Sequence, residues 1–209
     1  MLFRSNILKS VEEPTNLANI YFLRQKETRG LGHAVACAKS FVGEEPFVVL
    51  YGDDVILGEK PVTLQLMEAY EKYGLPCCGI KAVAQSDIQK YSSLKVDPLE
   101  ENLYKVTDMI EKPKPGQEFS LYSILGRVLL TPDIFDVLAH TAPGAGNEIQ
   151  LTDAMAETSR TIGMTGVDFY GTRYDMGNKF EILKANIEVG LSHPETGEKL
   201  RAYLKGLSL

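Results

Sequence analysis

The chain has 209 residues, of which 44% are hydrophobic and 24% are charged, and its formal net charge at pH 7 is −6. This balance is typical of a globular domain and disfavours nucleic acid and anionic membrane surfaces as partners. No window is long and apolar enough to cross a bilayer, and the first residues do not form a secretory signal peptide. Cys37, Cys77 and Cys78 form no disulfide framework, which favours the reducing cytoplasm.

Apolar runs typical of strands alternate along the chain with segments of helical periodicity. The expected strands are 20–23, 47–51, 78–83, 91–96, 104–110, 124–130 and 165–170. The expected helices are 33–39, 61–73, 133–138, 150–159, 180–191 and 197–204, the second with Leu64, Leu66 and Met67 on its inner side. This alternation predicts an α/β fold with a mostly parallel sheet.

Two carboxylates, Asp53 and Asp54, directly follow the strand expected at 47–51. Ligands of open α/β sheets lie beyond the carboxyl ends of the strands, and Gly52 lets the chain turn sharply there. Asp175 follows a later strand in the same way. Because Mg²⁺ takes one or two carboxylates and completes its shell with phosphate and water, the pattern predicts a Mg²⁺ site if the sheet brings Asp53 and Asp175 together. Each carboxylate alone also suits a turn or a helix N-cap.

The tripeptide Glu111-Lys112-Pro113 also follows an expected strand. A carboxylate accepts hydrogen bonds from paired sugar hydroxyls, and an ammonium group binds a phosphate as a point charge. Glu111 and Lys112 are therefore candidates for binding a sugar phosphate. The alternative for the tripeptide is an exposed charged turn.

Gln25 and the segment 30–33, Gly-Leu-Gly-His, form a further candidate site at the start of an expected helix. Glycines there let backbone N–H groups approach an anion or the edge of a base, and a glutamine amide can pair with a nucleobase. A single G-x-G is not specific for such a site. The histidines His33, His140 and His193 have no metal-ligand spacing and are interpreted as structural or surface residues.

The order of these motifs closely resembles that of the bacterial UTP–glucose-1-phosphate uridylyltransferases, the UDP-glucose pyrophosphorylases. The matching segments are Gln25, 30–34, 52–54, 111–113, the run E-I-Q-L-T-D-A at 148–154 and the run R-Y-D-M-G at 173–177. The resemblance extends from about Asn6 to the C-terminus. It implies a Rossmann-like nucleotidyltransferase fold with a mostly parallel mixed sheet flanked by helices.

The resemblance implies a reaction and its cofactor. The family joins UTP to α-D-glucose 1-phosphate with Mg²⁺, and the products are UDP-glucose and pyrophosphate. Asp53 and Asp175 are expected to hold Mg²⁺ and, with Lys112, to form the catalytic set. The implied substrate contacts are Gln25 and Gly30 with uracil, Glu111 with the glucose hydroxyls, Lys112 with the sugar's phosphate, and Ser92, where many relatives have glycine, with the sugar through its backbone. No role is implied for Asp54, where relatives also carry an apolar residue. Asn147 replaces a glycine, which asparagine permits at φ > 0.

The resemblance also marks a departure at the N-terminus. The family pattern opens with a strand and a G-x-G-T-R loop that bind the triphosphate, whereas this sequence begins inside the pattern at 16–21. We therefore expect a domain without its first βα units, with weak or no transfer activity alone. Residues 1–5 do not resemble the family and are expected to be a non-native leader, which leaves 6–209 as a single partial nucleotidyltransferase domain.

Two alternatives to such an enzyme fragment remain open. The chain could be a non-catalytic sugar-phosphate-binding or regulatory subunit, or a related transferase for another sugar or nucleotide. The E-I-Q-L-T-D-A run favours the uridylyl–glucose branch. Since intact relatives commonly assemble as oligomers, the resemblance also implies a homo-oligomer for the intact parent, with neither nucleic acid nor membrane as a partner.

Overall fold

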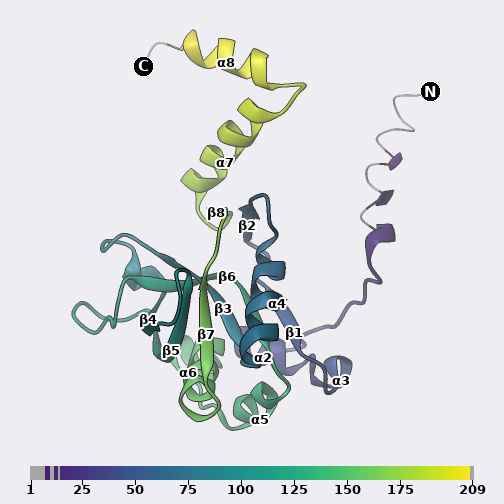
Figure 1. The fold of residues 1–209 in the computed structure, drawn as a ribbon. Helices are drawn as coiled ribbons and strands as arrows, with labels where there is room; N and C mark the ends of the chain where they lie inside the picture. Colours follow the sequence, from purple (N-terminus) through teal and green to yellow (C-terminus); the bar gives the residue numbers. More distant parts are fainter. Residues whose placement is uncertain (1–7, 10–11, 14, 208–209) are drawn as a thin grey trace.

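A six-stranded sheet forms the centre of the molecule (Figure 1). The computed structural model describes residues 8–9, 12–13 and 15–207, so the leader expected at 1–5 lies outside the described residues. The strands, in their order across the sheet, are β1 (Phe47–Leu50), β6 (Tyr122–Leu130), β3 (Cys77–Ala82), β7 (Met164–Asp168), β5 (Leu103–Glu111) and β4 (Ser92–Pro98). The sequence predicted each of these strands to within a few residues.

The expectation of a mostly parallel sheet is wrong for the described strands. Only β3 and β7 run parallel, and the other neighbouring pairs are antiparallel. The alternation of strands and helices does not fix strand direction, because a short turn such as 99–102 joins β4 and β5 as an antiparallel hairpin. The broader expectation, a mixed sheet flanked by helices, is confirmed.

Helices pack over two separate cores of the sheet. α2 (Leu31–Ala36), α5 (Asp133–His140) and α6 (Leu151–Thr161) contact one another and cover the core that contains Cys78. α4 (Val62–Tyr73) covers the core that contains Cys77. Neighbouring residues of one strand point to opposite faces, so the two cores lie on opposite sides of the sheet. Three short helices are α3 (Lys39–Val42), η1 (Ile88–Lys90) and η2 (Ala145–Asn147). Asn147 has a positive φ of 59°, the conformation that the sequence suggested.

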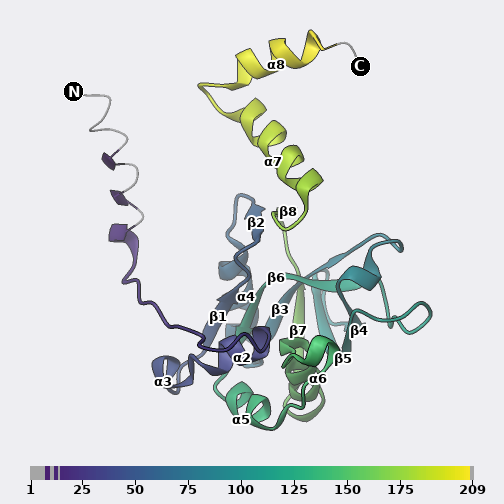
Figure 2. The same ribbon diagram turned by 180° about the vertical axis from the view of Figure 1, so that it is seen from behind.

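Residues 20–23 do not form the expected strand. They have no regular secondary structure, and their side chains are largely exposed, with Phe22 at 93% (Figure 2 shows this segment from behind). An extended apolar run becomes a strand only when a neighbour takes its backbone hydrogen bonds. In the described part of the chain no strand pairs with 20–23.

The inner face of α4 differs from the prediction. Leu66 is buried, but Leu64 and Met67 are each 43% exposed. The buried stripe contains Gln65, whose amide is satisfied by the backbone of Tyr170: Gln65 Nε2 donates to the Tyr170 carbonyl at 2.9 Å, and the Tyr170 N–H donates to Oε1 at 2.8 Å. A polar residue thus takes a buried position that hydrophobicity alone assigns to leucine or methionine.

A two-stranded ribbon beside the main sheet escaped prediction. β2 (Asp54–Leu57) pairs antiparallel with β8 (Thr172–Asp175), and Asp54 lies opposite Asp175. Each strand has only 4 residues, too few for a clear period-two pattern. Beyond the ribbon, α7 (Lys179–Ser192) and α8 (Gly197–Lys205) extend away from the sheet (Figure 1). None of the helices in the described ranges is long and apolar enough to cross a membrane.

Candidate active site

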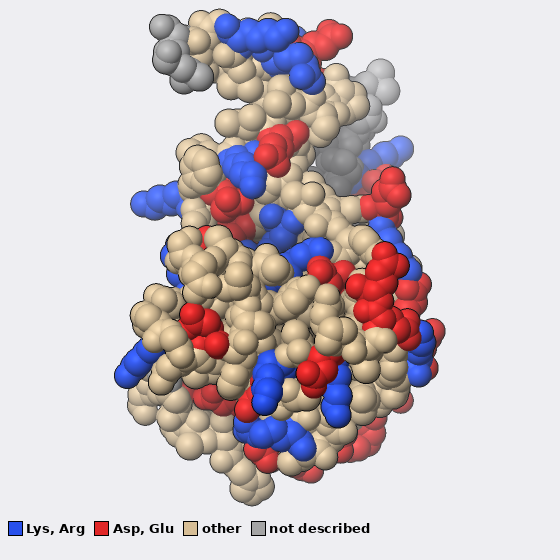
Figure 3. Space-filling view, turned by 60° about the vertical axis from the view of Figure 1, so that its left-hand side comes forward, with Lys and Arg blue, Asp and Glu red and all other residues tan. Residues whose placement is uncertain are grey.

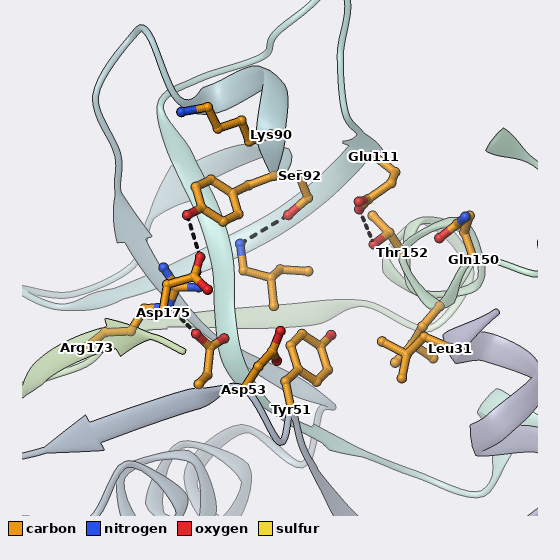
Figure 4. Close-up of a pocket in the computed structure, with 14 residues that line it drawn as sticks. Leu31, Tyr51, Asp53, Lys90, Ser92, Glu111, Gln150, Thr152, Arg173 and Asp175 are labelled. Atoms are coloured by element: carbon orange, nitrogen blue, oxygen red, sulfur yellow. Dashed lines mark hydrogen bonds and ion pairs between the residues drawn. The ribbon is translucent and has the colours of Figure 1, made fainter. Parts of the chain in front are cut away.

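A cavity of about 190 Å³ lies where β1, β4, β5, β8 and the start of α6 meet (Figure 4). Its lining residues are Leu31, Tyr51, Asp53, Asp54, Lys90, Tyr91, Ser92, Glu111, Ile124, Gln150, Leu151, Thr152, Arg173 and Asp175. Four residues singled out from the sequence, Asp53, Ser92, Glu111 and Asp175, are brought together here. Gln25, Gly30 and Lys112 do not line the cavity.

Asp53 and Asp175 meet across Gly177. A Cβ atom added to Gly177 would lie 3.1 Å from Asp175 Oδ1 and 3.4 Å from Asp53 Oδ2, so both oxygens face the same small space. The Gly177 N–H donates to Asp175 Oδ1 at 2.9 Å. Within the described residues, no hydrogen bond or ion pair is found for the Asp53 carboxylate, which leaves it available to a ligand.

Arg173 joins the two strands of the ribbon through their carboxylates. Its Nε donates to Asp54 Oδ1 at 2.5 Å, and its Nη2 lies 3.4 Å from Asp175 Oδ2. Asp54 is only 6% exposed, and burial raises its pKa, which the ion pair with Arg173 opposes. Gly126, at φ 77°, makes room for it, since a Cβ there would lie 2.7 Å from Asp54 Cβ. Asp54, to which the sequence assigned no role, therefore holds Arg173.

We call Asp53, Asp54, Arg173 and Asp175 the acidic corner. Three carboxylates face one guanidinium there, which leaves an excess of two negative charges when all are ionised. That excess and the two oxygens beside Gly177 fit a divalent cation that also takes oxygens from a phosphate. Among the described residues no group of three or more His, Cys, Asp or Glu side chains forms a metal site on its own. The two carboxylates therefore fit a divalent cation that takes its other ligands from elsewhere.

Glu111 lies on the opposite wall of the cavity, at the end of β5. Thr152, in the first turn of α6, donates its hydroxyl to Glu111 Oε2 at 2.7 Å and so fixes the orientation of the carboxylate (Figure 4). Tyr51 completes this region: burial raises its pKa far above the ordinary value, and the nearby Glu111 and Asp54 add to the effect. Tyr51 therefore presents a neutral hydroxyl at neutral pH.

The glycines near Gln25 pack against a distant part of the chain. The Gly32 N–H donates to the Ile149 carbonyl at 2.9 Å, and the Ile149 N–H donates to the Arg29 carbonyl at 2.8 Å. Gly30 has φ 93°, and a Cβ there would lie 2.8 Å from the Ile149 carbonyl oxygen. We call residues 29–32 and 148–149 the glycine seam. The close packing of the seam explains why both positions are glycine, since a Cβ atom at either would clash with Ile149. The contact of Gly30 with a nucleobase stays a prediction.

Gln25 supports this seam from the side. Its Nε2 donates to the Gly30 carbonyl at 3.2 Å and lies 2.8 Å from His33 Nδ1. His33 thus takes part in a local polar contact, in line with its structural interpretation. The amide nitrogen of Gln25 is therefore already engaged with the loop. The contact of Gln25 with uracil remains a prediction.

Lys112 and Ser92 differ in their surroundings. Lys112 is exposed and has φ 45°, while its N–H donates to the Tyr91 carbonyl at 2.9 Å. Ser92 is 4% exposed, and its hydroxyl accepts from the Ile124 N–H at 3.2 Å and lies 3.2 Å from Ser123 Oγ. The Ser92 hydroxyl is thus committed to the sheet, while the contact of its backbone with a sugar stays a prediction.

Several lining residues were missed by sequence reasoning. They are Tyr51, Lys90, Tyr91, Gln150, Thr152 and Arg173. Thr152 and Arg173 lie inside runs that carried the family resemblance, so those runs held the available signal. Tyr91 donates its hydroxyl to Asp175 Oδ2 at 2.9 Å, a contact that no spacing in the sequence reveals.

The charge on one face of the molecule is mixed. On the face drawn in Figure 3, Lys and Arg side chains are interspersed with Asp and Glu. No broad field of one sign is seen on that face.

The model of one protein family, described as nucleotidyl transferase, matches residues 4–190. The chain belongs to the nucleotidyl transferase family. Members of this family are enzymes that generally use a divalent metal ion, and the acidic corner fits that requirement.

Two similar relatives are named for the same activity. A Staphylococcus epidermidis protein named UTP–glucose-1-phosphate uridylyltransferase is 43% identical over 206 residues, which are 99% of this chain and 72% of that protein. The Bacillus subtilis UTP–glucose-1-phosphate uridylyltransferase YngB is 43% identical over 202 residues, covering 97% and 68%. The recognition made from the motifs is confirmed.

Solved structures of nucleotidyl transferases agree with this assignment. A UDP-glucose pyrophosphorylase complexed with UDP-glucose matches with a TM-score of 0.87 and 33% identity, covering 92% of this chain and 74% of that one. A UTP-bound enzyme from Acinetobacter baumannii matches with a TM-score of 0.83 and 29% identity, covering 99% and 74%. The nucleotidyltransferase fold expected from the sequence is therefore confirmed.

Proposed function

We propose that the chain binds UTP and α-D-glucose 1-phosphate and serves uridylyl transfer between them, giving UDP-glucose and pyrophosphate. The observation that carries the proposal is the arrangement of one cavity, in which Asp53 and Asp175 lie on one wall and the Glu111–Thr152 pair lies on the other. A site for a phosphate-bound cation and a site for sugar hydroxyls thus share one space. Relatives that are 43% identical have the name of this activity.

The reaction exchanges one phosphoanhydride bond for another. An oxygen of the sugar's phosphate attacks the α-phosphorus of UTP in line, a new P–O bond forms, and the bond between the α-phosphorus and the bridging oxygen breaks. Pyrophosphate leaves with the electron pair. No proton needs to move in this step, so the protein contributes mainly orientation and charge neutralisation.

Each predicted residue has a place in this proposal. Asp53 and Asp175 would hold Mg²⁺, and the ion, when bound, neutralises phosphate charge. The Asp53 carboxylate is suited to this because no partner occupies it within the described residues. Glu111, oriented by Thr152, would accept hydrogen bonds from glucose hydroxyls. Lys112 would bind the sugar's phosphate, and for this its exposed side chain must turn toward the cavity.

Nucleobase recognition and assembly form a second part of the proposal. Gln25 and Gly30 would read uracil near Leu31, which lines the cavity, and the backbone of Ser92 would contact the sugar. We propose further that residues 6–209 act as one domain, that the protein works in the cytoplasm, and that it assembles as a homo-oligomer. The three cysteines are free, which suits a reducing compartment.

A coupled assay tests the proposal. Purified chain is given UTP, glucose 1-phosphate and Mg²⁺, and UDP-glucose and pyrophosphate are measured, with TTP and CTP as competing nucleotides. Asp53→Asn and Asp175→Asn should abolish any formation of product, whereas Asp97→Asn, in an exposed strand position, should not.

Binding separates the enzyme from the alternatives. If no product forms, saturation-transfer NMR with UDP-glucose shows whether the cavity is a binding site without catalysis. The absence of both turnover and UDP-glucose binding would contradict the proposal. Preferential use of TTP or CTP would favour a nucleotidyltransferase for another nucleotide.

A further inference from the structure

Tyr91 stands at the edge of the acidic corner on a firmly held backbone. It ends the short helix η1, where its N–H donates to the Ile88 carbonyl at 3.2 Å. Its own carbonyl accepts from the Lys112 N–H at 2.9 Å. Hydrogen bonds thus hold the peptide groups on both sides of Tyr91, so its backbone position is fixed.

The Tyr91 ring is aimed at two members of the acidic corner. Its hydroxyl donates to Asp175 Oδ2 at 2.9 Å, and its ring centroid lies 5.2 Å from the Arg173 guanidinium carbon. A phenol is protonated at neutral pH, so the Tyr91 hydroxyl is a hydrogen-bond donor to the Asp175 carboxylate.

The two oxygens of Asp175 have different surroundings. Oδ2 accepts from the Tyr91 hydroxyl and lies 3.4 Å from Arg173 Nη2. Oδ1 accepts only the Gly177 N–H among the bonds found in the described chain, and it faces the space shared with Asp53 Oδ2. A half turn about the Cβ–Cγ bond only exchanges two equivalent oxygens, but any smaller rotation would break the bond to Tyr91. That bond, together with Arg173 and the Gly177 N–H, therefore fixes the plane of the carboxylate in which one oxygen faces Asp53.

We infer that Tyr91 is a positioning residue for the divalent cation, and that it acts by holding Asp175 Oδ2 so that Oδ1 stays turned toward Asp53. The inference rests on the proposed function, since it takes Asp53 and Asp175 as the ligands. Partners of metal-binding side chains fix ligand orientation, and their loss typically weakens metal affinity about 10- to 100-fold. Tyr91→Phe removes only the hydroxyl and keeps the ring against Arg173.

The test is a titration with Mn²⁺ alone, a paramagnetic substitute for Mg²⁺, followed by electron paramagnetic resonance. Tyr91→Phe should weaken Mn²⁺ binding about 10- to 100-fold. Tyr104→Phe is the matched control, because Tyr104 and Tyr122 share a hydroxyl–hydroxyl contact of 2.8 Å outside the cavity. The control should bind Mn²⁺ within about twofold of the unsubstituted chain, because its hydroxyl touches no proposed ligand.

Asp53→Asn distinguishes a failure of the proposed metal site from a failure of the role of Tyr91. If Asp53→Asn loses Mn²⁺ while Tyr91→Phe keeps full affinity, the metal site stands and the role of Tyr91 is overturned. If the unsubstituted chain binds no Mn²⁺, or Asp53→Asn binds it equally well, the proposed metal site fails and the inference fails with it.

The Gly177 amide gives a readout that does not need the metal. Because its N–H donates to Asp175 Oδ1, a carboxylate released by Tyr91→Phe should shift the Gly177 cross-peak in an amide NMR spectrum. Tyr104→Phe should leave that cross-peak in place. An unmoved Gly177 signal in Tyr91→Phe would contradict the positioning role even if metal affinity fell.

Discussion

The acidic corner and the glycine seam border the same cavity but are held together in different ways. In the corner, side chains of opposite charge meet, with Arg173 between Asp54 and Asp175. In the seam, backbone meets backbone, and the contacts exist because Gly30 and Gly32 have no Cβ. The comparison teaches that the corner should tolerate small changes of shape but not of charge, and that the seam should tolerate changes of charge nearby but not of shape.

Removal of the central charge of the corner should have the largest effect. Arg173→Met leaves Asp54 buried without a cation, and removal of one partner of a buried ion pair typically costs about 3–5 kcal/mol of unfolding free energy. Urea denaturation at pH 7.5 measures this loss. A loss below about 1 kcal/mol, the usual value of an exposed pair, would show that the corner does not depend on charge.

The same variant has a defined pH dependence. The folded-state pKa of Asp54 is already raised by burial, and loss of Arg173 raises it further because the ion pair opposed that rise. A group with a raised folded pKa contributes stability below its unfolded pKa and loses it as pH rises through the folded pKa. The difference between Arg173→Met and the unsubstituted chain should therefore shrink as pH falls from 7.5 toward ~4, the ordinary range of aspartate. A difference independent of pH would assign the loss to packing.

The seam should respond to shape with the next largest effect. Gly30→Ala adds a Cβ at φ 93° against the Ile149 carbonyl, so strain and overpacking together should cost about 2–4 kcal/mol. Gly43→Ala is the control, because Gly43 also has a positive φ, of 66°, but nothing lies within 4 Å of its added Cβ. It should cost only about 1 kcal/mol. Equal losses in thermal or urea unfolding would mean that the seam contact is not important.

A hydrogen bond on the opposite wall should have a smaller effect. Thr152→Val removes the hydroxyl that donates to Glu111 and should cost about 1 kcal/mol of stability. It should also weaken UDP-glucose binding, since the Glu111 carboxylate is then free to turn. Thr158→Val, in the same helix, removes a bond to the Ala154 carbonyl and should leave the binding of UDP-glucose unchanged. Calorimetric titration with UDP-glucose distinguishes the two variants.

Lys112 belongs to neither region, and its substitution should have the smallest effect. Lys112→Gly should raise the stability of the fold but weaken its function. Its φ of 45° is strained for a residue with a side chain, so Lys112→Gly should stabilise the fold by about 1 kcal/mol. If Lys112 binds the sugar's phosphate, the same variant should raise the KM for glucose 1-phosphate. Lys112→Ala keeps the strain and should change only the KM. A stabilised variant with an unchanged KM would remove Lys112 from the site.

The parts of the site that follow strands could be predicted from the sequence. Asp53 follows β1 and Glu111 ends β5, and the ends of strands are where α/β sheets bind ligands. Asp175 was placed after the strand expected at 165–170, but it ends β8, which the sequence did not predict. The strands themselves were found because burial on both faces gives continuous apolar runs. Their directions were not, because a hydrophobic run reads the same in a parallel and in an antiparallel sheet.

The partners of those residues could not be predicted. Tyr91, Thr152 and Arg173 act through contacts whose geometry depends on the finished fold, and a lone tyrosine, threonine or arginine has no distinguishing period. The ribbon that carries Arg173 has strands too short for pattern analysis. The same holds for Gln65, because the sequence shows no reason to bury a glutamine until its hydrogen-bond partner at Tyr170 is known.

The β2–β8 ribbon also bears on the order of folding. The β4–β5 hairpin closes through a short turn, whereas the contact between Asp54 and Arg173 joins residues 119 positions apart. Closure of so long a loop costs more chain entropy than closure of a hairpin, so the hairpin forms readily and the ribbon must wait for the sheet to bring its ends together. The acidic corner is therefore assembled late, and in a refolding experiment affinity for a divalent cation should appear with the last phase.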